Sequence, residues 1–133
     1  MALKLEIVTP DRIVLSAEAD YVSLPGTEGE FGVLPGHVPL FAALKTGCMH
    51  YQHEGQTVYA SLREGFAEVA DGTVQLLVDS AELAGEIDVG RAEAALKRAQ
   101  ERLSSPQRDA VNVARAEAAL QRASVRLQAA KLK

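Results

Sequence analysis

Residues 66–78 read FAEVADGTVQLLV, two short apolar runs joined by an Asp71-Gly72 pair. Asp-Gly between two such runs is a strong signal for a two-residue β-hairpin, because both central residues of the favoured turn need a positive φ. The stretch therefore predicts two antiparallel strands, and the strand pattern continues towards the N-terminus.

Residues 3–7 (LKLEI) alternate apolar and charged side chains, which is the period of a half-buried strand. Further short apolar runs, interpreted as strands, lie at Arg12–Leu15, Tyr21–Leu24, Phe31–Leu34, Cys48–His53 and Thr57–Leu62. Turn signals separate these runs, and Glu54-Gly55 is a second, weaker hairpin signal. This pattern predicts a β-sandwich or barrel over residues 1–86.

The chain changes character at Asp88, beyond which it holds one proline, one glycine and many helix-forming residues. Asp88 and Asp109 are expected to cap two helices, and Ser104-Ser105-Pro106 is expected to end the first. Small and apolar residues form a stripe on each helix: Ala92, Leu96, Ala99 and Leu103, then Val113, Ala116, Leu120, Ala123 and Leu127. Residues 87–133 are therefore predicted to form an antiparallel two-helix hairpin. Alanine stripes bury little area, so we expect this hairpin to be marginally stable.

The two parts carry opposite charge. Residues 1–87 hold four Lys/Arg and thirteen Asp/Glu, a net of −9, whereas residues 88–133 hold ten Lys/Arg and five Asp/Glu, a net of +5. The acidic part argues against nucleic acid as the main ligand, and the basic part leaves an anionic ligand open. No apolar run approaches the roughly 20 residues that a spanning helix needs, and no secretory signal pattern is present. We therefore expect a soluble protein of the cytoplasm.

Metal and enzyme sites find little support in the sequence. Cys48, His50 and His53 are the candidate zinc ligands, but their spacing matches no closed zinc site, and we interpret them as lining alternate positions of one strand. The chain has no phosphate-binding loop, no dinucleotide fingerprint and no nucleophile elbow. We therefore predict no catalytic residue and no bound metal.

The segment GEFGVLPGHVPL, residues 29–40, places Phe31 and four other apolar residues where glycine and proline disfavour regular structure. Exposed apolar loops mark partner sites, while burial in the sandwich core is the competing explanation. His37 in this segment is interpreted as a turn histidine that hydrogen-bonds backbone or a partner protein, because no partner base or nucleophile is evident.

The strongest chemical feature is a set of arginines on the predicted helices. Arg91 and Arg98 share a face of the first helix, and Arg122 and Arg126 share a face of the second. If the hairpin closes, the four guanidiniums are expected to converge near the start of the first helix. Guanidinium forks suit phosphate oxygens, so a nucleotide site is one reading and a solvated basic face is the other.

Three segments resemble a known family. Thr9-Pro10-Asp11, the GEFGVLPGHVPL segment at 29–40 and the Ile87-Asp88-Val89-Gly90-Arg91-Ala92 segment are similar to the epsilon subunit of bacterial rotary (F-type) ATP synthases, and the resemblance covers essentially the whole chain. It implies a sandwich of about ten strands followed by the two-helix hairpin. The chain departs from the family's pattern at Gly90, in the first helical turn, and at the proline in the loop between the helices. Neither departure removes a ligand, but both are expected to alter how the hairpin closes.

The resemblance also implies a rotor, or central stalk, subunit of the proton-translocating enzyme, without a catalytic site of its own. Its sandwich, residues 1–86, would dock on the gamma subunit and the c ring through Glu30, Phe31 and His37. Its hairpin, residues 87–133, would extend towards the alpha and beta subunits and inhibit ATP hydrolysis. The complex would place it on the cytoplasmic face of the bacterial cell membrane, as a peripheral subunit that touches the membrane only through its partners.

The resemblance implies no required cofactor, but it implies ATP as a regulatory ligand of the folded hairpin. Residues near the adenine would be Glu82, Ile87 and Asp88, and those near the phosphates would be Arg91, Arg98, Arg122 and Arg126. Two other classes remain open: a free-standing nucleotide-sensing module, and an enzyme built on the sandwich. Stable association with gamma would distinguish the rotor subunit from a free-standing sensor. ATP turnover by the isolated chain would support an enzyme.

Overall fold

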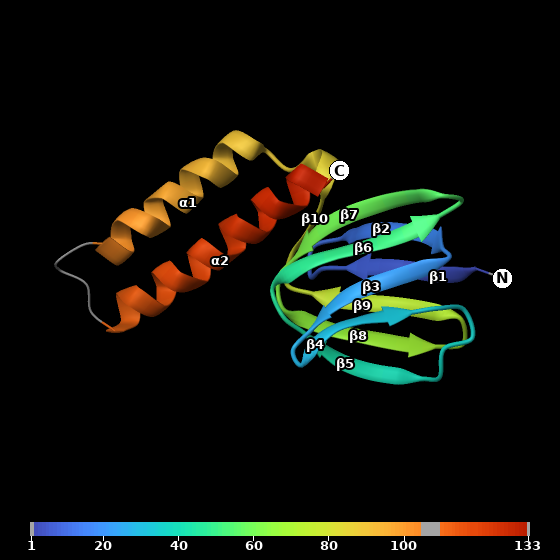
Figure 1. Cartoon of the computed structure of the whole chain (residues 1–133). Helices are drawn as coiled ribbons and strands as arrows, with labels where there is room; N and C mark the ends of the chain where they lie inside the picture. Colours follow the sequence, from blue (N-terminus) through green and yellow to red (C-terminus); the bar gives the residue numbers. More distant parts are fainter. Residues whose placement is uncertain (1, 105–109, 133) are drawn as a thin grey trace.

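The computed structural model describes residues 2–104 and 110–132, and it shows a β-sandwich followed by two antiparallel helices (Figure 1). The predicted fold class, a sandwich of about ten strands and a two-helix hairpin, is confirmed. The hairpin projects from one end of the sandwich, and α2 packs against β6, β7 and the 3-10 turn η1. No described helix is long and apolar enough to cross a membrane.

The elements follow one another with short connections. The strands are β1 (Leu3–Val8), β2 (Ile13–Ala19), β3 (Tyr21–Gly26), β4 (Gly29–Val33), β5 (Leu40–Leu44), β6 (Gly47–His53), β7 (Gln56–Leu62), β8 (Gly65–Ala70), β9 (Thr73–Val78) and β10 (Ala81–Leu83). They precede η1 (Ala84–Glu86), α1 (Val89–Ser104) and α2 (Ala110–Leu132).

The strand order is β10-β7-β6-β3-β5-β8-β9-β1-β2, with β4 paired to β3 alone. Strand β3 joins the two halves of the sandwich, because it pairs with β6 over its first residues and with β5 only where Gly26 lies opposite Leu44. At the other end of the order, β1 runs parallel to β9. This topology brings the end of β7 and the start of β10 to the side of the sandwich that faces the hairpin (Figure 1).

The core is mostly aliphatic, and it lies between the two halves of the sheet. Alternate residues of β1 and β9 point inwards, and Leu5, Ile7, Val74 and Leu76 are fully buried. The two predicted hairpin turns are confirmed, because each is closed by a pair of positive-φ residues: Glu54 with Gly55, and Asp71 with Gly72.

Three details differ from the sequence predictions. Strands β5 and β10 were not predicted, because β10 is very short and the run of β5 merges with the proline-rich segment before it. Residues 29–33 form β4, because β3 offers them a paired edge. This confirms the apolar run at Phe31–Leu34 as a strand, and it corrects the description of the whole 29–40 segment as irregular. His53 does not share a face with Cys48 and His50, because strand side chains alternate and His53 stands an odd number of positions away.

The helices begin and pack as the alanine stripes indicate. Asp88 caps α1, since its Oδ1 accepts a hydrogen bond from the Arg91 backbone N–H at 3.1 Å. The alanines of both stripes are buried between the helices: Ala92, Ala99, Ala116 and Ala123. The expected cap Asp109 and the loop proline Pro106 lie outside the described residues, and α1 ends at Ser104 as predicted.

Candidate functional site: an arginine-lined cavity between hairpin and sandwich

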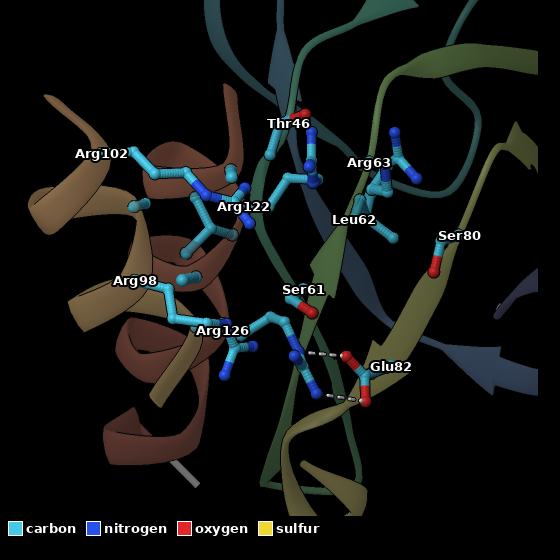
Figure 2. Close-up of a pocket in the computed structure, with 15 residues that line it drawn as sticks. Thr46, Ser61, Leu62, Arg63, Ser80, Glu82, Arg98, Arg102, Arg122 and Arg126 are labelled. Carbon is cyan, nitrogen blue, oxygen red and sulfur yellow. Dashed lines mark hydrogen bonds and ion pairs between the residues drawn. The ribbon is translucent and has the colours of Figure 1, made fainter. Parts of the chain in front are cut away.

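A cavity of about 420 Å³ lies between the helical hairpin and the edge of the sandwich (Figure 2). Both helices and the strand ends contribute to its wall: Thr46, Ser61, Leu62, Arg63, Ser80, Glu82, Ala95, Arg98, Ala99, Arg102, Ala119, Arg122, Ala123, Val125 and Arg126. The helical alanines in this wall are small and leave room for the cavity. On the sandwich side, it is lined by the hydroxyl residues Thr46, Ser61 and Ser80. A volume of this size is typical of a small-molecule pocket.

Five arginines give the cavity its chemistry. Arg98 and Arg102 are four residues apart on α1, so they lie on one face of that helix. Arg122 and Arg126 are four apart on α2, and Figure 2 shows side chains from both helices reaching towards the strands. The fifth, Arg63, follows directly after β7.

One carboxylate lies among these cations. Glu82 of β10 pairs with Arg126 through two contacts, Nε to Oε1 at 2.5 Å and Nη2 to Oε2 at 3.2 Å. This bidentate pair joins the sandwich to α2 across the floor of the cavity (Figure 2). The remaining four arginines have no ion-pair partner among the described residues. The cavity therefore has a surplus of positive charge and favours an anion with several oxygens.

The sequence-derived site residues fall into two groups. Glu82 and three of the predicted phosphate residues, Arg98, Arg122 and Arg126, line the cavity together. Ile87, Asp88 and Arg91 are not part of its wall. Ile87 is buried against the end of α2, whereas Asp88 and Arg91 are exposed at the cap of α1. The assignment of these three residues to a nucleotide stays a prediction.

The arginines also meet at a different place from the one expected. The cavity is lined by α1 residues from Ala95 to Arg102, which lie beyond the start of the helix. The reason is the register of the two helices: Ala129 and Ala130, at the end of α2, pack against Ile87, which lies just before α1. Arg122, nearer the middle of α2, therefore lines the cavity beside a later part of α1.

Sequence reasoning missed two of the five arginines. Arg102 had a detectable signal, because it follows Arg98 at i+4 on the same helix face. Arg63 had none, because its place depends on how β7 and β10 pair. The hydroxyls of Thr46, Ser61 and Ser80 were missed for the same reason.

The hairpin is held against the sandwich by a small apolar contact. Ile87, Ala129 and Ala130 form a buried cluster of their own, and Cys48 of β6 packs against it. The Cys48 thiol also donates a hydrogen bond to the Val125 carbonyl oxygen at 3.4 Å. Burial raises the pKa of the Cys48 thiol above its ordinary value. The thiol is therefore a partly buried group at the contact between the hairpin and the sandwich.

A second surface, on the outer face of β5, β8 and β9, exposes large apolar side chains. Phe41 and Phe66 stack with ring centroids 5.4 Å apart, and they are 64% and 48% exposed. Leu77 lies opposite Phe66 in the register and is also exposed. We call Phe41, Phe66 and Leu77 the apolar patch. Contiguous exposed apolar groups of this kind mark protein contacts.

The three predicted partner-contact residues lie on β4 and in the turn that follows it. Glu30 is exposed and accepts a hydrogen bond from the Ser23 hydroxyl at 2.5 Å. Phe31 is half-buried and packs against the core. His37 is half-buried, and its ring Nδ1 lies 2.7 Å from the Val38 carbonyl oxygen. Partner contact through these residues stays a prediction.

Two family models together match nearly the whole chain. The β-sandwich domain of the ATP synthase delta/epsilon chain matches residues 2–84, and the long α-helix domain of the same chain matches residues 86–131. The ATP synthase epsilon chain of Lawsonia intracellularis is 48% identical over 108 residues, which is 81% of each chain. That of Nitratidesulfovibrio vulgaris (strain DP4) is 52% identical over 103 residues, 77% of each chain.

Solved structures agree with the family models. A chain in the cryo-EM structure of the Euglena gracilis mitochondrial ATP synthase (OSCP/F1/c-ring, rotational state 1) matches with a TM-score of 0.82 and 27% identity, over 99% of this chain and 82% of that one. A chain of the Tetrahymena thermophila mitochondrial ATP synthase (central stalk/c-ring) shares the fold, with a TM-score of 0.62 at 12% identity over 98% and 97% of the two chains. On the evidence of both domains and of these relatives, the chain belongs to the delta/epsilon chain family of the ATP synthases.

Proposed function

We propose that this chain is a rotor subunit of a proton-translocating ATP synthase, and that it couples the gamma subunit to the c ring. Family membership supports the assignment. The apolar patch offers a face for a protein partner, and we assign that partner as gamma. We assign Glu30, Phe31 and His37 to the contact with gamma and the c ring. The subunit has no catalytic site of its own and sits peripherally on the cytoplasmic face of the bacterial membrane.

The arginine-lined cavity carries the regulatory part of the proposal. It binds ATP, whose triphosphate matches the surplus of guanidinium forks on α1 and α2. The ligand contacts the helices and the sandwich at once, so it stabilises the docked hairpin by RT ln(1+[ATP]/Kd). When ATP is scarce, the hairpin opens and extends towards the alpha and beta subunits, where it inhibits ATP hydrolysis. A ligand shifts this equilibrium only by its differential affinity for the two forms.

Titration of the isolated chain with ATP by calorimetry tests the proposal. We expect saturable binding of one ATP per chain, and no conversion of ATP to ADP over the same period. Absence of heat up to several millimolar ATP would remove the sensor and leave the arginines as a basic face of the hairpin. ATP turnover would instead favour an enzyme.

Cys48 supplies a natural reporter of hairpin docking, because it is the one cysteine of the chain. Thiol reagents attack the thiolate. The docked hairpin packs against Cys48, whose pKa is raised by burial, so we expect labelling at pH 8 to proceed mainly through the open hairpin. ATP at 100 times its Kd is expected to slow labelling by about a hundredfold. The chain unfolded in urea serves as control, since its rate should not respond to ATP. An unchanged rate in the folded chain would contradict ATP-driven docking.

A free-standing nucleotide sensor is the second candidate, and the arginine-lined cavity alone would fit it equally well. Co-expression with gamma distinguishes the two. A rotor subunit is expected to purify in a stable complex with gamma, and Phe41→Glu, which places a charge on the apolar patch, is expected to weaken that complex. A chain that binds ATP but never associates with gamma would be the free-standing sensor.

A further inference from the structure

Arg63 differs from the other four arginines of the cavity. It comes from the sandwich, directly after β7, whereas the other four belong to the hairpin. Its backbone N–H donates to the Ser80 carbonyl oxygen at 2.9 Å, which ties this end of β7 to the turn before β10. The position of Arg63 is therefore set by the folded sandwich, whether or not the hairpin is docked.

The side chain of Arg63 is half-buried, yet it has no partner among the described residues. Its Nε is shielded from solvent without any hydrogen-bond partner, and no described carboxylate forms an ion pair with it. Arg126, the other cavity arginine with a buried Nε, has its charge paired by Glu82. A buried donor without a partner is unfavourable, so native proteins normally supply one from protein, water or ligand.

Figure 2 shows where Arg63 lies. Arg63 lies in the upper part of the picture with Thr46 and Arg122, whereas the Glu82–Arg126 pair lies in the lower part. A carboxylate repels phosphate oxygens, whereas unpaired guanidiniums attract them. The phosphate groups of a bound ligand should therefore gather away from Glu82, on the side of Arg63.

We propose that Arg63 is a phosphate-contacting residue supplied by the sandwich, so that a polyphosphate chain is held between Arg63 on one side and the hairpin arginines on the other. This inference rests on the proposed nucleotide site and assigns it a residue outside the hairpin. The ligand then acts as a bridge, because its phosphates contact the two units that separate when the hairpin opens. Arg63 makes docking depend on the ligand, while the Glu82–Arg126 pair is available without it.

The test uses the full chain with two probes, ATP and inorganic tripolyphosphate, each titrated by calorimetry. Arg63→Gln is expected to lower the affinity for both probes by about tenfold to a hundredfold, the usual loss for one charged hydrogen-bonding group. Arg63→Lys keeps the charge but loses the fork, so it should fall between wild type and Arg63→Gln. Arg12→Gln, at an exposed arginine outside the cavity, is the matched control and should bind within twofold of wild type.

Thermal unfolding without ligand separates ligand binding from a structural role. The Arg63 side chain has no partner to lose in the part of the chain that the structure describes. Arg63→Gln should therefore melt at or above the wild-type temperature, while the rise in Tm on adding ATP should shrink. Wild-type affinity for both probes in Arg63→Gln would overturn the inference, and reduced ATP binding in Arg122→Gln would then leave the nucleotide site standing. If tripolyphosphate binds in an Arg63-dependent way but ATP does not bind, the nucleotide proposal falls and the phosphate contact holds. If wild type binds neither probe, both fall.

Discussion

Changing Arg98 and Arg122 together to glutamine is expected to lower the affinity for ATP by about a hundredfold or more. The two residues line the cavity from different helices, and neither has an ion-pair partner among the described residues. Each guanidinium offers several donors in a fixed fork that fits phosphate, and glutamine keeps a side chain of similar reach without the charge. Calorimetric titration of ATP into the double variant measures the loss.

A matched control keeps this result specific to the cavity. Lys97→Gln with Arg115→Gln removes one positive charge from each helix at exposed positions outside the cavity wall. We expect this pair to bind ATP within threefold of wild type, because exposed charges are screened by salt and water. Helical content from circular dichroism should be the same in all three proteins. If the cavity variant binds like wild type, ATP does not occupy this cavity.

The amides of α1 and α2 are expected to exchange with solvent deuterium about a hundredfold or more faster than those of β1 and β9. The apolar contact between hairpin and sandwich is limited to Ile87, two alanines and Cys48, whereas the sandwich core contains many fully buried large side chains. A difference in opening free energy of about 3 kcal/mol corresponds to two orders of magnitude in exchange. Mass spectrometry of peptides from each element measures this difference, and saturating ATP should slow exchange in the helices alone.

Two carboxylate variants sharpen the exchange experiment. Glu82→Gln removes the bidentate pair with Arg126 that joins β10 to α2, so it should speed exchange in the hairpin. Glu6→Gln removes the ion pair with Lys4 within β1, and it should leave the hairpin unchanged. Equal protection in helices and sandwich core would show that the hairpin is a fixed part of the fold, which would contradict an ATP-controlled opening.

Local signals explain how much of the fold was predictable. Asp71-Gly72 and Glu54-Gly55 fix their turns through backbone geometry, and Asp88 fixes the start of α1 through one hydrogen bond. Each of these effects involves residues within a few positions of one another, so sequence is sufficient. Strand β4 had two interpretations, an apolar strand at Phe31–Leu34 and an irregular segment at residues 29–40, because the strand is stabilised by its pairing with β3. Glycine and proline around it concealed that long-range partner.

The candidate site shows the same division. Arg98, Arg122 and Arg126 could be predicted to share a site, because helical spacing places them on facing surfaces of one hairpin. The location of that site could not, since it depends on how far along α1 the end of α2 reaches. Arg63 was beyond sequence reasoning altogether, because its neighbours in the cavity come from elements far away in the chain.

The parallel pairing of β1 with β9 has a consequence for the chain as it is made on a ribosome. Lys4 lies opposite Thr73, so one edge of the first strand stays open until the ninth has emerged. An unpaired edge is a template for association with other chains, and long-range pairing is slow to form. Nascent chains that stall before residue 73 keep that edge unpaired, and we expect them to aggregate more readily than the complete chain. Synthesis that stops just after β10 yields all ten strands and Arg63, but none of the four helix-borne arginines of the cavity.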